Sequence, residues 1–380
     1  MYMFVLKGDI VTNGSIFNDC FIQITGHKIT YVGKVQPKSD APLYEVDGFI
    51  CPGFTDIHIH GIDGFDFMDK GVFQDISDLL PKYGVTSYLA TSRTAPITDI
   101  RQFLEEAKQS KKAFTKARML GVHLEGPWIS ASYSGAQSTD YIREFSKTDL
   151  KELIVPYSEI IKKITLAPEE LKDLSIIKAL EELDIKVSAG HTDATIGEIR
   201  KAITCGLRNL THTFNAMSPI HHRTPGTAVA ALYYDELFCE IITDGVHIHP
   251  IMIELLYRTK GKEKVIIISD CTGYNNLQDG AYDLRGKELK RTGNKVTLKD
   301  GTLAGSAITL DKGVKYVVEN CNIPLEDAVF MVTESPTSVV GTQKKLGRIE
   351  VGYEADLTIL NKDLEVKETI IDGKLIYKRV

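Results

Sequence analysis

Long apolar runs are missing from this chain of 380 residues. The apolar runs that the chain does contain are far shorter than the roughly 20 consecutive apolar residues that a membrane-spanning helix needs. The first ten residues also lack the basic and apolar regions of a secretory signal peptide. A net charge of −6 gives no general attraction to nucleic acid or to anionic membranes. We therefore expect a protein that binds neither nucleic acid nor a membrane.

Paired cysteines are also missing. The six cysteines are scattered along the chain and form no CxxC pair. In a chain of this size they are typical of reduced, mostly buried thiols, which predicts a cytoplasmic protein. Cys271 follows Asp270 and could be a nucleophile, but a metal site would need no thiol nucleophile.

The middle of the chain contains eight short apolar runs, most of them separated by helix-like segments. The runs are Phe54–His60, Val85–Thr91, Met119–Glu125, Ile161–Ala167, Ile185–His191, Asn209–Thr213, Phe238–Asp244 and Val265–Asp270. Strands that are apolar nearly throughout are typical of a parallel sheet covered on both faces. We predict an α/β fold in which residues 53–344 form a (β/α)8 barrel of the TIM type. The polar, turn-rich stretch Tyr274–Leu303 is expected to cover or border the barrel mouth.

The two ends of the chain have a different pattern from the middle. Short alternating runs are interrupted by the turn signals Asn13-Gly14, Asp47-Gly48 and Asp372-Gly373, which are typical of hairpins. We predict that residues 1–52 and 345–380 together form one small β-sandwich domain. The barrel would then be inserted into this domain.

Six residues with metal-binding or acid–base side chains lie in or at the ends of the predicted barrel strands. They are His58, His60, Glu125, His191, His212 and Asp270. The carboxyl ends of barrel strands surround one mouth, so residues far apart in sequence would meet there. Any one of them alone could be a core histidine or a capping acid. Six together predict a metal site.

His58 and His60 are two residues apart on one strand, so both imidazoles can reach one ion. Imidazole and carboxylate ligands suit zinc, iron, manganese or a similar divalent ion. Such an ion lowers the pKa of a water molecule and polarises a carbonyl. Asp270 could accept the proton of that water and return it to a leaving amine, and it could also be a metal ligand.

The order of these residues is similar to that of the amidohydrolase superfamily. Within it the chain closely resembles the N-acetylglucosamine-6-phosphate deacetylase family over essentially its whole length. The motifs are Pro52–Gly61, His123–Pro127, Gly190–Ala194, Thr211–Met217, His221–Gly226, Asp244–His247, Leu303–Ser306, Gly347–Ile349 and Ala355–Leu357. The resemblance implies hydrolysis of N-acetyl-D-glucosamine 6-phosphate to D-glucosamine 6-phosphate and acetate, in amino-sugar catabolism, by a homodimer.

The resemblance also implies roles for individual residues. Glu125, His191 and His212 would hold the principal ion. His58 and His60 allow a second ion, so the resemblance implies one or two ions per chain and leaves their number open. Asp270 would be the catalytic acid and base. The expected substrate contacts are Ala136, Gln137, Asn215, Ala216, Arg223, Asp244, His247, Leu303, Ala304 and Gly305. Without the resemblance, Arg223 could equally be a surface charge.

One departure from the family pattern concerns Gln137, which stands where the family usually has a histidine. A glutamine amide donates a hydrogen bond but carries no charge or transferable proton. Thr224 and the pair Thr227-Ala228 also depart from the usual residues. The alternatives are an amidohydrolase acting on a different N-acylated sugar or a cyclic amide, and a barrel without catalysis.

Overall fold

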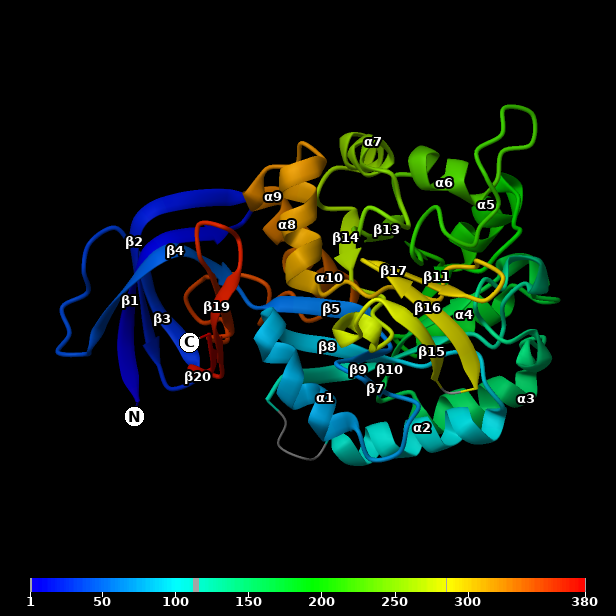
Figure 1. The fold of residues 1–380 in the computed structure, drawn as a ribbon, viewed down its shortest axis with the longest axis horizontal. Helices are drawn as coiled ribbons and strands as arrows, with labels where there is room; N and C mark the ends of the chain where they lie inside the picture. Colours follow the sequence, from blue (N-terminus) through cyan, green and yellow to red (C-terminus); the bar gives the residue numbers. More distant parts are fainter. Residues whose placement is uncertain (1, 112–115, 285, 380) are drawn as a thin grey trace.

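The structure is a computed structural model that describes residues 2–111, 116–284 and 286–379. A barrel with helices around it lies beside a smaller sheet, and both chain ends belong to that smaller sheet (Figure 1). The predicted combination of a barrel and a β-structure from both termini is therefore confirmed.

Eight parallel strands form the barrel sheet, in the order β14-β13-β12-β11-β10-β9-β8-β5. They are β5 (Phe54–Ile59), β8 (Val85–Thr91), β9 (Arg118–Glu125), β10 (Ile161–Leu166), β11 (Lys186–Ala189), β12 (Asn209–Leu210), β13 (Phe238–Ile242) and β14 (Val265–Ile268). Each strand overlaps one of the predicted apolar runs. A backbone hydrogen bond joins the ends of the first and last strands: Asp270 N–H donates to the His58 carbonyl at 2.9 Å.

Helices surround the barrel sheet and bury its outer face (Figure 1). They are α1 (Phe73–Leu79), α2 (Ile97–Ser110), α3 (Lys147–Asp149), α4 (Ser175–Glu182), α5 (Ile196–Cys205), α6 (Thr227–Tyr233), α7 (Pro250–Lys260), α8 (Leu310–Asn320), α9 (Leu325–Val332) and α10 (Glu334–Val339). Short helical turns are η1 (Leu80–Tyr83), η2 (Ala131–Tyr133), η3 (Thr139–Tyr141), η4 (Leu150–Ile154), η5 (Val155–Tyr157), η6 (Pro168–Glu170) and η7 (Tyr274–Asn276). The β–α alternation directs the carboxyl ends of all eight strands to one mouth.

The terminal strands form one seven-stranded sheet in the order β20-β19-β18-β4-β1-β2-β3. They are β1 (Met3–Thr12), β2 (Ser15–Thr25), β3 (Lys28–Gly33), β4 (Leu43–Pro52), β18 (Leu357–Leu360), β19 (Val366–Ile371) and β20 (Lys374–Lys378). Buried side chains from both ends of the chain share one core, among them Ile22 and Leu357.

Of the turns predicted in these terminal segments, two are present and one is not. Asn13 and Gly14 both have positive φ, as do Asp372 and Gly373, and each pair connects two antiparallel strands. The predicted turn at Asp47-Gly48 is wrong, because both residues lie inside β4. Gly48 has φ 145°, and a Cβ there would lie 2.0 Å from the Leu360 carbonyl oxygen. This glycine lets β4 approach β18 closely, at the point where the register between β1 and β4 shifts.

A three-stranded antiparallel sheet follows the last barrel strand. Its strands are β15 (Gly280–Leu284), β16 (Lys287–Thr292) and β17 (Lys295–Leu298), and a small hairpin is made by β6 (Gly61–Ile62) and β7 (Phe65–Asp66). Leu289 of β16 and Leu303 line the pocket at the barrel mouth. The predicted excursion after the eighth strand therefore borders this mouth.

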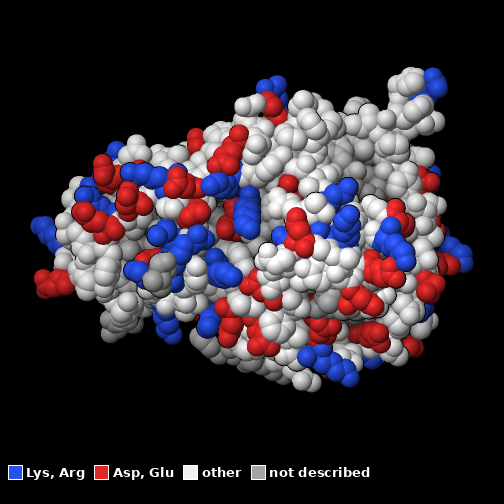
Figure 2. All heavy atoms as spheres, viewed as in Figure 1, with Lys and Arg blue, Asp and Glu red and all other residues white. Residues whose placement is uncertain are grey.

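The visible surface carries charges of both signs. Lysine and arginine side chains are interspersed with aspartate and glutamate over the terminal sheet and the barrel alike (Figure 2). Within the described ranges, no helix has the length and apolar character needed to cross a membrane.

Candidate active site

The six residues singled out at the strand ends meet at the barrel mouth and are all buried. His58 lies in β5 and His60 directly follows it, and their Nε2 atoms are 3.3 Å apart. Glu125 is the last residue of β9. The remaining three follow their strands by two residues: His191 after β11, His212 after β12 and Asp270 after β14. The barrel thus gathers side chains that lie more than 200 residues apart in the sequence.

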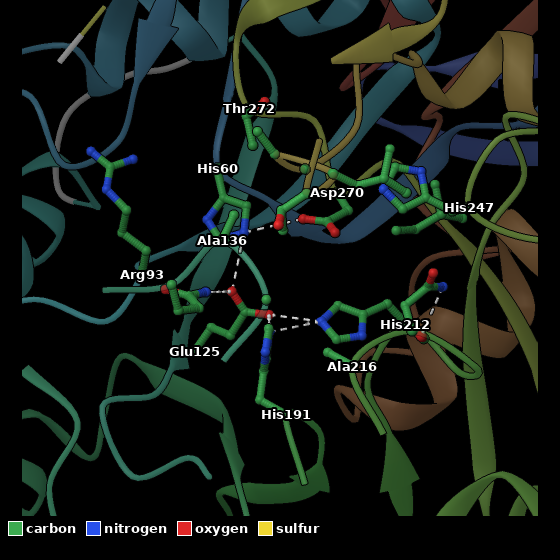
Figure 3. Close-up of a pocket in the computed structure, with 18 of the residues that line it drawn as sticks. His60, Arg93, Glu125, Ala136, His191, His212, Ala216, His247, Asp270 and Thr272 are labelled. Carbon is green, nitrogen blue, oxygen red and sulfur yellow. Dashed lines mark hydrogen bonds and ion pairs between the residues drawn. The ribbon is translucent and has the colours of Figure 1, made fainter. Parts of the chain in front are cut away.

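Glu125 lies at the centre of this cluster (Figure 3). Its Oε1 is 3.2 Å from His212 Nε2 and 3.4 Å from His191 Nε2, and its Oε2 is 3.3 Å from His60 Nε2. Two groups therefore share Glu125, and the ligand atoms within each group lie within 4.8 Å of one another. The groups are His58 with His60 and Glu125, and Glu125 with His191 and His212. Each combines imidazole nitrogens with a carboxylate, a donor set that fits a divalent transition metal.

The backbone around the cluster adopts a conformation that side chains disfavour. Five non-glycine residues at or beside the site have positive φ, and they are His191, His212, Phe214, Ala216 and Asp270. Outside turns, non-glycine residues with positive φ are uncommon in proteins, and they concentrate at functional sites. This conformation also explains why β12 ends at Leu210 and not at Thr213 as predicted, since His212 leaves the extended region at φ 29°.

The electrostatics of the cluster favour ionised carboxylates. Burial alone would raise the pKa of Glu125, but the imidazoles around it hold that pKa well below its ordinary value. Burial likewise opposes ionisation of Asp270, and His58 and His60 outweigh it and lower the pKa of Asp270 to about 2. His60 lies against both carboxylates, which raise its pKa to about 10 although burial alone would lower it. A cation bound among these acids would favour the same ionised carboxylates.

Hydrogen bonds behind two of the histidines orient their rings. His191 Nδ1 lies 2.9 Å from the Tyr133 carbonyl oxygen, and His58 Nδ1 lies 3.2 Å from Glu240 Oε2. Both partners are acceptors, so Nδ1 carries the proton and the unprotonated Nε2 faces the cluster. Metal-binding histidines in proteins show this arrangement, which supports the fit of the site to a metal ion.

A pocket of about 420 Å³ opens above the cluster. Thirteen residues predicted from the sequence line it: His60, Glu125, Ala136, Gln137, His191, His212, Asn215, Ala216, His247, Asp270, Leu303, Ala304 and Gly305. Gln137 contacts Glu125 directly, with Nε2 to Oε2 at 2.6 Å, while its Oε1 accepts a hydrogen bond from Thr94 N–H at 2.8 Å. The backbone donor at Thr94 fixes which end of the amide faces Glu125.

Three of the predicted site residues do not line the pocket. His58 lies beneath it as part of the cluster. Asp244 lies behind His247 and accepts from its Nδ1 at 2.7 Å, which orients that ring. Arg223 lies on an exposed loop before α6, where its Nη1 is 2.8 Å from His222 Nε2. Within this chain, Arg223 is not brought to the pocket, and its contact with a phosphate stays a prediction.

Several residues of the site were not predicted from the sequence. Arg93 lines the pocket after β8 and pairs with the buried Asp66. In Figure 3 it lies on the opposite side of the cluster from His247. Its place just past a barrel strand is the signal that could have found it. The other unpredicted lining residues are Ser132, Tyr133, Gly135, Ile242, Thr272, Tyr274, Leu289 and Thr302.

The barrel and its His/Glu cluster define a class, that of barrel hydrolases with a metal centre at the strand ends. The sequence profile of the amidohydrolase family matches residues 49–376. The chain belongs to the amidohydrolase family and is a hydrolase.

Relatives match the chain over most of its length, and solved structures share its architecture. The chain is 36% identical to an N-acetylglucosamine-6-phosphate deacetylase of Bacillus subtilis, over 97% of this chain and 95% of that protein. It is 32% identical to an N-acetylgalactosamine-6-phosphate deacetylase of Escherichia coli O157:H7, over 86% and 87%. The crystal structure of N-acetylglucosamine-6-phosphate deacetylase from Pasteurella multocida superimposes with a TM-score of 0.93 at 30% identity and covers both chains fully.

Proposed function

We propose that the protein hydrolyses the acetamide of N-acetyl-D-glucosamine 6-phosphate to D-glucosamine 6-phosphate and acetate, in amino-sugar catabolism. The observation that carries this proposal is the cluster of two His/Glu groups with Asp270 beside them at the floor of one pocket. The relatives named above act on acetylated amino-sugar phosphates, which supports the substrate class. The complete set of ligands supports a catalytic barrel over a barrel without catalysis.

Glu125, His191 and His212 would hold the principal divalent ion, and His58 and His60 would hold a second with Glu125. Zinc, iron and manganese all suit this donor set. Such an ion, when bound, polarises the amide carbonyl and lowers the pKa of a water molecule. The chain's own contribution is to fix the imidazole rings by the contacts at Tyr133 and Glu240.

Asp270 would transfer the proton. Its Oδ1 lies 3.2 Å from His60 Nε2 and its low pKa keeps it ionised at neutral pH. An ionised carboxylate can accept the proton of the attacking water and then deliver it to the departing amine nitrogen. The side chain is buried, so bulk water would not compete for the proton between the two transfers.

The remaining pocket residues would hold the sugar phosphate. The side chain of Asn215, the backbone of Ala216 and the ring of His247, oriented by Asp244, offer donors suited to the phosphate. Arg223 would add a guanidinium from its exposed loop. Leu303, Ala304 and Gly305 would line the sugar. The second N–H of Gln137 Nε2 would donate to the acyl oxygen, because the first is taken by Glu125.

The test is acetate release from a panel of sugars by the purified protein. N-acetylglucosamine 6-phosphate, its unphosphorylated form and N-acetylgalactosamine 6-phosphate would be compared by kcat/KM. The proposal expects the first to be the best substrate. No acetate from any member of the panel, with metal present, would contradict it.

A second candidate substrate is N-acetylgalactosamine 6-phosphate, favoured by the 32% identity to the Escherichia coli relative. The two sugars differ in configuration at one carbon, so the metal centre and Asp270 would act in the same way on both. Gln137 would face the acetyl group that both sugars share, so a preference between them would arise from the contacts to the sugar ring. A higher kcat/KM for the galactosamine derivative would replace the first substrate by the second.

We also propose that residues 1–52 and 345–380 form one domain and residues 53–344 another. The core shared by the terminal strands supports this division. The protein would be a cytoplasmic homodimer. The cysteines are free thiols, as a reducing compartment favours.

A further inference from the structure

A pair of charged residues lies in the barrel interior beneath the His/Glu cluster. Lys163 of β10 and Glu240 of β13 are both completely buried there, although their strands lie three positions apart in the barrel sheet. The interior of such a barrel is usually filled by valine, isoleucine and leucine. A buried ion pair is rarely retained for stability, because an apolar pair of similar size is often equally stable. Stability alone therefore does not explain why Lys163 and Glu240 are buried in the barrel.

The contacts of Glu240 supply that reason. Its Oε1 contacts Lys163 Nζ, and its Oε2 lies 3.2 Å from His58 Nδ1. The carboxylate thus joins a fixed ammonium group to the back of one predicted metal ligand. His58 Nε2, on the other side of the ring, lies 3.4 Å from both Glu125 Oε1 and Asp270 Oδ1.

The other half of the centre is supported differently. His191 Nδ1 faces a neutral backbone carbonyl, that of Tyr133, and the buried His212 Nδ1 has no hydrogen-bond partner in the described part of the chain. Of these three histidines, His58 is the one with a charged acceptor at Nδ1 among the described residues, which makes the two halves unequal. It holds the Nδ1 proton in place and makes Nε2 a stronger electron donor.

We propose that Glu240, held by Lys163, is a positioning residue for His58 and determines how tightly the half of the centre formed by His58, His60 and Glu125 binds its ion. This inference rests on the proposed metal centre. Loss of Glu240 would weaken the ion at this half, while the ion held by Glu125, His191 and His212 would keep its affinity.

Two double variants and one control separate this role from a merely structural one. Glu240→Gln alone leaves the Lys163 ammonium buried without its carboxylate and risks misfolding. Lys163→Met/Glu240→Gln removes both charges and keeps an acceptor for His58 Nδ1, and Lys163→Met/Glu240→Leu removes the acceptor as well. Ser87→Ala is the matched control, because it deletes a buried barrel hydrogen bond to Thr55 without touching a ligand.

The readout is ion binding and does not depend on activity. Protein freed of metal with a chelator is titrated with Zn²⁺ by calorimetry. The position of each ion is assigned by anomalous scattering from crystals. Wild type and Ser87→Ala are expected to bind two ions. The Leu double variant should bind the ion at His58 and His60 about 10- to 100-fold more weakly. The Gln double variant should recover part of that loss.

The outcomes are distinct. Equal weakening of both ions, or equal behaviour of the two double variants, would overturn the inference and leave Lys163 and Glu240 a structural pair. Wild type with one ion, held only by Glu125, His191 and His212, would also overturn it. If the wild type binds no ion, the result contradicts the proposed function. The other outcomes leave the proposed function in place and contradict only the inference about Glu240.

Discussion

Replacing Asp270 by asparagine tests the proposed proton transfer most directly. The change keeps the shape of the side chain and removes its ability to accept a proton. In the structure, Asp270 Oδ1 lies 3.2 Å from His60 Nε2 and 3.4 Å from His58 Nε2, and the side chain is 9% exposed. No solvent-exposed base could easily substitute at this position.

The size of the effect follows from the number of steps that Asp270 would serve. A general acid or base contributes about 100- to 10,000-fold. One carboxylate that acts first as base and then as acid should lie at the upper end. We expect kcat to fall by about 10,000-fold, which corresponds to about 5.5 kcal/mol of activation free energy.

The pH dependence adds a second criterion. The pKa of Asp270 is lowered to about 2, so its ionised and active form is present above that pH and is lost only as pH falls towards 2. A cation bound to the same histidines would likewise favour the ionised form of Asp270. The ratio of wild-type to variant kcat should therefore stay constant between pH 5 and pH 8.

The assay is acetate release at saturating substrate, with metal content measured on the same samples. Asp311→Asn is a matched control, because Asp311 is also buried but lies in α8 and does not line the pocket. The control should keep nearly normal kcat. A variant Asp270→Asn that retains kcat within about tenfold with metal bound would refute the proton-transfer role. Loss of activity in step with loss of metal would make Asp270 a ligand instead.

Three further predictions concern the ion, the phosphate and the thiol. Removal of metal with a chelator should abolish acetate release, and added Zn²⁺, Mn²⁺ or Fe²⁺ should restore it; activity unaffected in metal-free protein would exclude the proposed metal chemistry. His247→Ala should lower kcat/KM for the phosphorylated sugar by about 10- to 150-fold and leave the unphosphorylated sugar nearly unchanged, because a charge-assisted hydrogen bond contributes about 1.5–3 kcal/mol. Arg223→Ala should act in the same direction if its loop reaches the phosphate, whereas an effect of Arg93→Ala alone would put the phosphate at the other side of the pocket. Burial raises the pKa of the Cys271 thiol to about 12, so iodoacetamide at pH 8 should not modify this thiol in the folded protein or inactivate the protein. Rapid modification of Cys271 with loss of activity would instead support a role for Cys271 as a nucleophile.

The barrel could be predicted from the sequence because its signals are local. Each strand is an apolar run, and glycines such as Gly261, with φ 71° after α7, mark where helices end. The rule that strand ends converge then brings His58 and Asp270 together without any tertiary information. The hairpins at Asn13-Gly14 and Asp372-Gly373 were predictable for the same local reason.

Other features depend on neighbours that are distant in the sequence. Asp47-Gly48 has the composition of a turn, but pairing with β1 and β18 keeps it within a strand. The predicted strand Ile161–Ala167 has the weakest apolar pattern of the eight, because it contains Lys162 and Lys163. A lysine that is buried in a barrel needs a partner. That partner, Glu240, is 77 residues away and has no motif around it that identifies its role.

The sequence by itself determined the fold class, the types of candidate ligand and the order in which they follow the strands, because periodicity and strand-end chemistry are encoded over a few residues. Only the tertiary structure decided which side chains face one another. It put Gln137 against Glu125, Glu240 behind His58, and Arg93 in the pocket in place of Arg223. These contacts join separate βα units, and their geometry depends on how the closed barrel positions all eight strands at once.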